Sequence, residues 1–167
     1  MKEIINSLVL SIFVLISQLN LTTFKSQELN LVEENKVIKV VDGDTFDLFT
    51  KDGIKRVRLI GINTPETLDP RKDIECFGPE ASNKLKEILD GKVVKIDADE
   101  TQDDQDKYGR LLRYVFLDNE NINQKMINEG FAFEYTYKKK YKLQKEFKES
   151  QLNAKKNNLG LWKSCGY

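Results

Sequence analysis

Residues 37–62 read VIKVVDGDTFDLFTKDGIKRVRLIGI, and this stretch decides the fold. Two Asp-Gly dipeptides divide it into three runs that are rich in β-branched or alternating apolar residues: 37–41, 45–49 and 54–62. An Asp-Gly dipeptide between such runs is typical of a tight hairpin turn. Turns this short join antiparallel strands, because a parallel pair needs a much longer crossover connection. The stretch therefore predicts a three-stranded meander and argues against a βαβ unit.

The rest of the chain extends this meander into a small barrel. We expect Gly78 and Pro79 to open a helix that ends at Gly91, because proline is favoured at the first helical position and glycine just past the last one. Further strands and helices are expected at 93–96, 111–117, 121–129 and 141–157. Five short strands, with a helix inserted before the fourth, predict a five-stranded OB-fold barrel with about three packed helices.

The N-terminal segment differs in composition from the rest. Residues 8–16 are almost all apolar, a run too short to span a bilayer comfortably but suited to the core of a signal peptide. An uncleaved anchor, which would bring the protein to a membrane, and a buried helix are the alternatives. We expect a signal peptide, a flexible lead-in and a single functional domain, at 1–26, 27–36 and 37–167.

A signal peptide implies export, so that the protein is expected to be secreted, periplasmic or bound to the cell surface. Export brings a chain into oxidising conditions, in which Cys76 and Cys165 can form a disulfide. The alternative is two free thiols. No stable protein partner is implied, and we expect a monomer.

The composition excludes several kinds of chemistry. The 167 residues include 27 Lys plus Arg, 27 Asp plus Glu, two Cys and no His. A Ser-His-Asp or Cys-His pair, a histidine base and a histidine-bound zinc are therefore impossible. Two cysteines are too few for a four-cysteine zinc site or an iron–sulfur cluster. Catalysis must use carboxylates, arginine, lysine, tyrosine or hydroxyls, and a bound metal must be a hard cation with oxygen ligands.

The charges sum to zero but are segregated along the chain. Residues 97–106 hold six acids and no base, whereas 134–163 hold nine lysines and three acids. Most of these side chains are expected on solvated surfaces. A basic face around Lys138–Lys140 that meets phosphates is the functional alternative.

Four short parts of the chain together supply what phosphodiester hydrolysis without histidine requires: 42–45, Arg58, 63–66 and 106–110. Each of them alone has a structural explanation, such as a turn. Asp44, the Asn63 amide and the Thr64 carbonyl offer oxygen ligands for a divalent cation. The nearby carboxylate of Glu66 can activate a water molecule. Arg58 and Arg110 offer bidentate donors for the charge that develops on phosphorus.

The same segments carry a resemblance to a known family. The motifs are VDGDT at 41–45, RLIGINTPET at 58–67, FGPEAS at 77–82, DKYGR at 106–110 and GLW at 160–162. As a set they resemble the thermonuclease (staphylococcal nuclease-like) family over about residues 36–162. The resemblance implies an OB barrel with packed helices, which agrees with the strand pattern. It also implies calcium-dependent cleavage of DNA and RNA that leaves 3′-phosphate ends.

Carried over by motif, the resemblance assigns a role to each candidate residue. Asp44 is a calcium ligand, Thr64 supplies a carbonyl ligand, and Glu66 is the general base. The residues that hold the phosphate are Arg58 and Arg110. The residues that contact bound substrate are Lys107, Tyr108, Tyr135 and Tyr137, the two later tyrosines by a weaker match in spacing.

Asn63 departs from the family pattern, which has a carboxylate at this position. An amide oxygen still binds Ca²⁺, but affinity rises with ligand charge, so weaker binding is expected.

Two other classes of function remain open. A non-catalytic nucleic-acid-binding OB module is expected to have lost Glu66 or an arginine, and a purely structural or protein-binding barrel has no need for this combination of side chains.

Overall fold

The computed structural model describes residues 33–67 and 74–167, and the expected signal peptide at 1–26 lies outside this part of the chain. The chain divides into two units, 1–33 and 34–167, and the account below concerns the second. Among the residues described, no helix combines the length and hydrophobicity needed to cross a bilayer.

The predicted meander is present. Strands β1 (Val37–Asp42), β2 (Thr45–Thr50) and β3 (Gly53–Leu59) pair in antiparallel order, with Thr45 opposite Arg58 in the β2–β3 pair. Alternation buries Phe46, Leu48 and Val57 completely. Each buried apolar side chain of this size contributes about 1.5–3 kcal/mol, so the inward face of the meander anchors the fold.

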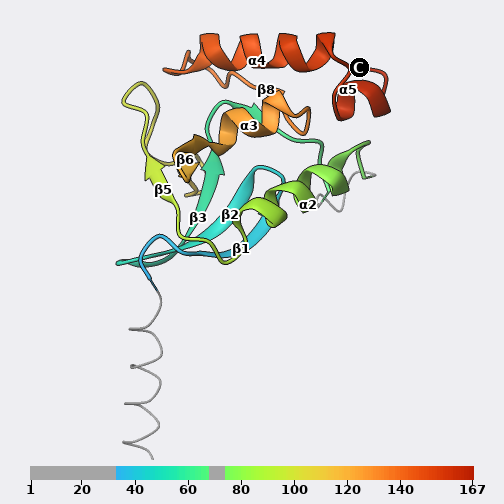
Figure 1. The fold of residues 1–167 in the computed structure, drawn as a ribbon. Coiled ribbons are helices and arrows are strands. Elements are labelled where there is room, and N and C mark those ends of the chain that lie inside the picture. The colour runs from blue at the N-terminus through green and yellow to red at the C-terminus, as the bar shows by residue number, and fades with distance from the viewer. Residues whose placement is uncertain (1–32, 68–73) are drawn as a thin grey trace, which may run out of the picture. The chain divides into compact units, whose positions relative to one another are not determined.

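The remaining strands complete an OB-like mixed sheet in the order β1-β2-β3-β6-β5 (Figure 1). They are β5 (Lys95–Asp97), β6 (Leu111–Leu117), and β7 (Glu120–Asn121), which pairs with β6. The β3–β6 pair is parallel and sets Arg58 opposite Leu112. An isolated bridge between Lys36 and Val93 links the two edges, so the sheet curls toward a barrel without a continuous closing ladder.

Four described helices pack on this sheet: α2 (Gly78–Leu89), α3 (Ile122–Asn128), α4 (Gln144–Lys156) and α5 (Leu161–Ser164). Helix α2 lies against β1, whereas α3 lies between β6 and α4 (Figure 1). The apolar positions predicted for α3, Ile122, Met126 and Ile127, are all buried. The fold is therefore the OB-type barrel with packed helices that the sequence predicts.

The third strand is shorter than predicted. It was expected to continue to Ile62 but ends at Leu59, and Ile62–Asn63 form a separate strand β4 that pairs with β8 (Phe133–Glu134). Gly61 makes the break, because its φ of +77° favours glycine and a Cβ there would lie 2.6 Å from the ring of Tyr141. The break turns the chain so that Asn63 and the residues after it lie beside the β1–β2 turn.

One acidic residue of the 97–106 segment belongs to the interior rather than to the solvated surface. Asp99 is 5% exposed and accepts hydrogen bonds from Tyr114 Oη at 2.6 Å, Lys142 N at 2.8 Å, and the backbone and hydroxyl of Thr101. Burial by itself raises the pKa of Asp99, but these donors outweigh it and hold the pKa below the ordinary value. The carboxylate thus ties β6 to the segment before α4.

We expect Asp99→Asn to lower the free energy of unfolding by about 1–3 kcal/mol at pH 7, because an amide cannot accept all four bonds. The pKa of Asp99 is lower in the folded protein than in the unfolded chain. The carboxylate therefore adds to the free energy of unfolding above the ordinary Asp pKa, and this stabilisation is lost as the pH falls through the pKa of the folded state. Urea denaturation of both proteins at pH 7 and about pH 3 measures this. An equal difference at both pH values would contradict the prediction.

Candidate active site

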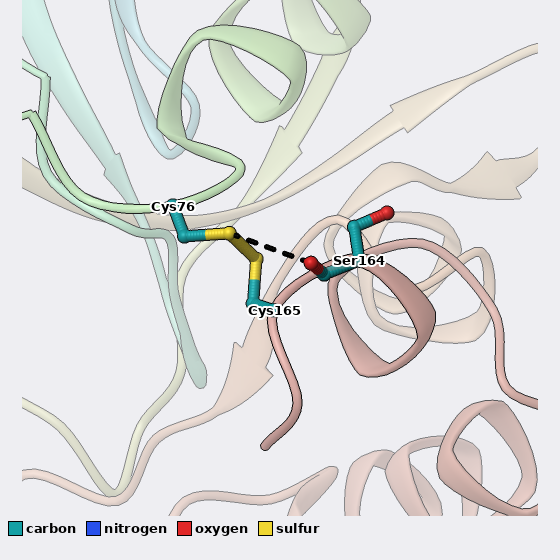
Figure 2. The surroundings of a disulfide bond; sticks show 3 residues. All are labelled: Cys76, Ser164 and Cys165. Carbon is teal, nitrogen blue, oxygen red and sulfur yellow. Dashed lines mark hydrogen bonds between the residues drawn. A yellow bond between two sulfur atoms is a disulfide. The ribbon is translucent and has the colours of Figure 1, made fainter.

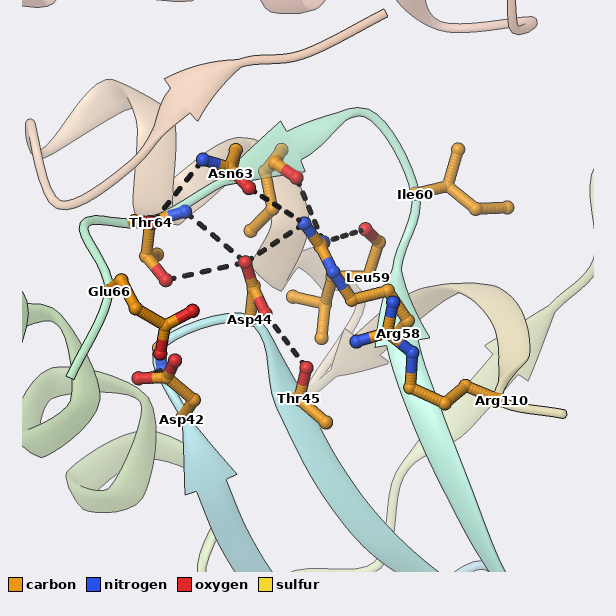
Figure 3. Close-up of polar contacts among 12 residues, drawn as sticks. Asp42, Asp44, Thr45, Arg58, Leu59, Ile60, Asn63, Thr64, Glu66 and Arg110 are labelled. Atoms are coloured by element: carbon orange, nitrogen blue, oxygen red, sulfur yellow. Dashed lines mark hydrogen bonds and ion pairs between the residues drawn. The ribbon is translucent and has the colours of Figure 1, made fainter. Parts of the chain in front are cut away.

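A polar cavity of about 300 Å³ lies where the β1–β2 turn, β3 and the segment after β4 meet. Its walls hold all the residues predicted as catalytic or metal-binding, together with three others: Asp42, Asp44, Thr45, Arg58, Asn63, Thr64, Glu66, Glu75 and Arg110. Figure 3 shows Asp42 and Glu66 on one side of Asp44, and Arg58 and Arg110 on the other. Segments far apart in the sequence thus converge on one space.

Asp44 is the central carboxylate of this cavity and is 7% exposed. Its Oδ1 accepts from Thr45 Oγ1 at 2.8 Å, and its Oδ2 accepts from the backbone and hydroxyl of Thr64 at 3.2 and 3.3 Å. Gly43 permits this approach, because a Cβ there would lie 2.8 Å from the Thr64 side chain. The turn that the sequence predicts as a hairpin therefore also fixes Asp44 against Thr64.

Arg58 is held rigidly next to Asp44. Its Nη2 forms an ion pair with Asp44 Oδ2 at 2.9 Å, while its Nη1 donates to the carbonyls of Leu59 and Ile62, both at 2.8 Å (Figure 3). The carbonyl contacts span the break between β3 and β4. Arg58 thus stabilises the turn that carries the site and presents a fixed positive charge to the cavity.

Asn63 links the arginine to the backbone of Thr64. Its Oδ1 accepts from Arg58 Nη2 at 3.2 Å, and its Nδ2 donates to the Thr64 carbonyl at 3.4 Å. The Asn63 amide therefore lies between Arg58 and the Thr64 carbonyl, with its oxygen toward the arginine and its nitrogen toward the carbonyl. The role of Asn63 and Thr64 as metal ligands stays a prediction.

Asp42 and Glu75 line the cavity but were not predicted as site residues. Burial raises the pKa of Asp42, and the charges of Asp44 and Glu66 add to the rise, against hydrogen bonds from Thr67 and Gly43 that lower it. Asp42 belongs to the candidate segment 42–45, but no role of its own was predicted for it. No sequence signal pointed to Glu75.

Glu66 is half-buried, and its carboxylate is fixed by its neighbour. Thr67 N donates to Glu66 Oε1 at 3.0 Å, and the Thr67 hydroxyl donates to Asp42 Oδ1 at 2.8 Å. Thr67 therefore sets the positions of two carboxylates at once. A carboxylate held in this way at the cavity wall is suited to accept a proton from a water molecule.

Arg110 is oriented by Asp106 from the loop before β6. Its Nε and Nη2 both lie 2.6 Å from Asp106 Oδ2, and Asp106 Oδ1 accepts from the backbone of Tyr108 and of Arg110. Burial by itself raises the pKa of Asp106, but the Arg110 side chain and these backbone donors lower it overall. Asp106 thus organises its loop and directs the guanidinium of Arg110.

The four predicted substrate residues lie outside the polar cavity, in a larger groove of about 790 Å³ that shares Arg58, Asn63 and Arg110 with it. Tyr108 is 70% exposed, with Lys107 Nζ 4.8 Å from the centre of its ring. Tyr135 and Tyr137 are stacked, with ring centres 6.3 Å apart. Exposed aromatic faces beside lysines form a surface on which nucleic-acid bases stack and phosphates bind.

The donor set suits a hard cation. Within residues 33–67 and 74–167, no three acidic, histidine or cysteine side chains converge closely enough to hold a metal ion. A cation in the cavity therefore needs backbone or amide oxygens and water besides Asp44, which is the ligand pattern that calcium accepts. The Thr64 backbone N–H contacts Asp44 and the Asn63 amide contacts the Thr64 carbonyl, so both oxygen-bearing groups are close enough to this carboxylate to fit the requirement.

An OB-type barrel that brings carboxylates and two arginines to one cavity, beside an aromatic and basic groove, defines a nuclease that works without histidine. Comparison with known proteins gives the family. The family model described as "Staphylococcal nuclease homologue" matches residues 56–164. The chain belongs to the staphylococcal nuclease, or thermonuclease, family.

Individual relatives agree with this assignment. The chain is 38% identical over 142 residues to a thermonuclease of Staphylococcus hyicus, covering 83% of this chain and 82% of the relative. It is 38% identical over 141 residues to a thermonuclease of Staphylococcus intermedius, covering 83% of this chain and 82% of that relative. It is also 34% identical over 130 residues to the SPbeta prophage-derived endonuclease YokF of Bacillus subtilis (strain 168), covering 77% of this chain and 44% of that protein.

Proposed function

We propose that the protein is a calcium-dependent endonuclease that hydrolyses phosphodiester bonds in DNA and RNA and leaves 3′-phosphate ends. The observation that carries this proposal is the polar cavity, in which Asp44, Thr64 and Glu66 face two arginines. Names of relatives that include thermonuclease and endonuclease support it. The roles below are inferred from the contacts of each residue.

Asp44, the Thr64 carbonyl and the Asn63 amide would hold the calcium ion, and Asp42 lies close enough to add negative charge. When bound, the ion supplies positive charge that stabilises the charge developing on the phosphate. The charges of Asp44 and Glu66, which help to raise the pKa of Asp42, support this, because a cation relieves repulsion between neighbouring carboxylates.

Glu66 acts as the general base that removes a proton from the attacking water. Arg58 and Arg110 hold the phosphate, and their fixed positions mean that little reorganisation is needed when charge develops. Asp44 and Asp106 orient one guanidinium each. Lys107, Tyr108, Tyr135 and Tyr137 bind the adjoining nucleotides in the groove.

The protein is exported and acts as a monomer, with residues 1–26 as its signal peptide, 27–36 as a lead-in and 37–167 as the nuclease domain. The predicted disulfide between Cys76 and Cys165 is present, which supports an oxidising compartment. Secretion, a periplasmic location and attachment to the cell surface all satisfy this proposal.

Cleavage of plasmid DNA and of RNA with Ca²⁺, and again with excess chelator, tests the proposal. We expect cleavage with Ca²⁺, loss of activity in chelator, recovery when Ca²⁺ is restored, and poor support by Zn²⁺ because no soft ligand is available. A 3′-phosphate should block polymerase extension until a phosphatase removes it. Undiminished cleavage in excess chelator would reject the metal requirement, and binding without cleavage would favour a non-catalytic module.

Asn63→Asp is expected to tighten Ca²⁺ binding by about tenfold, because it adds a charge to the ligand set and removes the amide that donates to the Thr64 carbonyl. The gain should be larger at low salt, where Coulomb attraction is less screened. Calorimetric titration with Ca²⁺ in the presence of a bound nucleotide measures it.

Asn119→Asp is the matched control, since Asn119 is exposed in the turn between β6 and β7 and lies outside the cavity. It makes the same change of charge and should leave the dissociation constant unaltered. If Asn63 only stabilises the turn at Thr64, both variants will bind Ca²⁺ as the unmodified protein does.

A further inference from the structure

The disulfide between Cys76 and Cys165 lies at the edge of the candidate active site. It joins residues 89 positions apart, with their Cα atoms 5.9 Å from each other (Figure 2). Cys76 directly follows Glu75, a residue of the cavity wall, and precedes the start of α2. The covalent link therefore reaches within one residue of the cavity.

Two hydrogen bonds join Glu75 to Glu66. Glu75 N donates to the Glu66 carbonyl at 3.0 Å, and Glu66 N donates to Glu75 Oε2 at 2.9 Å. The carbonyl of Glu75 in turn accepts from Gly78 N at 3.0 Å, at the beginning of α2. The segment that carries the proposed base is thus paired with the segment that carries Cys76.

The other end of the disulfide is a fixed part of the fold. Cys165 N donates to Leu161 O, and Leu161 is completely buried beside Trp162. Leu161 N donates to the Gly130 carbonyl at 2.8 Å, and the backbones at Gly130 and Gly160 approach so closely that neither position has room for a Cβ. Helix α5 is therefore an anchor, and a bond to it restricts the movement of Cys76.

This part of the site lies near the surface of the protein. Glu75 and Cys76 are exposed and Glu66 is half-buried, so little apolar burial fixes them.

We propose that the Cys76–Cys165 disulfide, acting through Glu75, positions Glu66 for catalysis. Cys76, Cys165 and Glu75 are positioning residues, because they act on the reaction only through Glu66. The proposal rests on the role of Glu66 in the proposed function. We call the disulfide, together with the hydrogen bonds between Glu75 and Glu66, the brace. A small displacement of a catalytic group lowers the rate strongly, so loss of this brace should lower kcat far more than it changes KM.

The first test compares the oxidised protein with the same protein in dithiothreitol, which donates two electrons and two protons to the disulfide and becomes a cyclic disulfide itself. The two cysteines of the chain are both in this bond, so the reductant alters no other residue. We expect kcat on single-stranded DNA to fall about 10–100-fold and KM to change less than about threefold. The variant with Cys76→Ser and Cys165→Ser should show the low kcat with or without reductant.

Folding is followed in the same samples. Trp162 is the single tryptophan and packs in the cluster next to Cys165, so its fluorescence reports whether α5 stays in place. Circular dichroism reports the barrel. Assays are made at a temperature where both signals match those of the oxidised protein.

The second test leaves the disulfide intact. Glu75→Ala removes the acceptor for Glu66 N and should lower kcat about 10-fold or more, whereas Glu75→Gln keeps an acceptor oxygen and should restore most of the loss. Reducing the disulfide in Glu75→Ala should add little further loss, because both changes remove the same brace.

The proposal is overturned if kcat stays within about twofold of the unmodified value in the folded reduced protein, or if it does so in Glu75→Ala. It is also overturned if Glu75→Gln and Glu75→Ala lose the same amount of kcat. The fourth contrary result is that the losses in kcat from reduction and from Glu75→Ala are additive. If reduction unfolds the protein, the Glu75 variants decide alone. Glu66→Gln separates the two proposals: normal turnover in Glu66→Gln rejects Glu66 as the base, whereas slow Glu66→Gln with unaffected Glu75→Ala rejects only the brace.

Discussion

Glu66→Gln is expected to lower kcat by about 10²–10⁴-fold while the binding of substrate changes little, because an amide cannot accept the proton of the attacking water. The side chain keeps its size, and Gln Oε1 can still accept from Thr67 N. The two hydrogen bonds to Glu75 use the backbone N–H and carbonyl of Glu66, so they do not involve the altered group. Single-turnover cleavage of a defined oligonucleotide, with affinity measured on an uncleavable phosphorothioate analogue, separates the rate from binding.

Glu80→Gln is the matched control for this change. Glu80 is an exposed residue in the first turn of α2 and does not line the cavity, so its variant should cleave at the normal rate. Turnover of Glu66→Gln close to that of Glu80→Gln would show that Glu66 is not the base.

Arg110→Lys is expected to lower kcat by about 10²–10³-fold, the usual cost of losing a fixed donor that faces developing charge. Asp106 binds Nε and Nη2 of Arg110 and so sets the plane of the guanidinium. Lysine keeps the charge but has one nitrogen, which cannot pair with Asp106 and hold a phosphate with two parallel bonds as well.

Arg56→Lys makes the same substitution away from the site. Arg56 binds both oxygens of Asp47, at 2.8 and 3.1 Å, on the exposed side of the β2–β3 pair. Its loss should leave kcat unaltered, since exposed ion pairs contribute little and the residue does not line the cavity. Equal rates for the Arg56 and Arg110 variants would exclude Arg110 from phosphate binding.

The meander could be predicted from the sequence because its register depends on local signals. Alternating apolar residues and Asp-Gly turns are encoded next to each other, so residues 37–59 needed no distant information. The end of β3 was missed, because Ile60 and Ile62 continue the apolar run. The break depends on packing of Gly61 against Tyr141, a contact between residues far apart in the chain.

The candidate site was predicted where motif residues are close in sequence, as with Asp44 or with Thr64 and Glu66. Glu75 was missed because its contact with Glu66 joins residues nine positions apart, and no local pattern indicates that contact. Most of the acidic run was expected on a solvated surface, and the exception is Asp99, which is buried, while Asp97 and Asp106 are half-buried. The partners of Asp99 and Asp106, Tyr114 and Arg110, are assigned only by the folded structure.

The parallel β3–β6 pair has a consequence for the timing of nuclease activity during biosynthesis. Arg58 reaches its place opposite Leu112 only after β6 has been made, and Arg110 enters the chain just before that strand. A nascent chain that ends before residue 110 thus has the β1–β2 turn and the Thr64 segment but lacks one of the two arginines. Long-range pairing of this kind is slow to form. If both arginines act as proposed, competence to cleave nucleic acid therefore arises late, after most of the polypeptide has left the ribosome that made it.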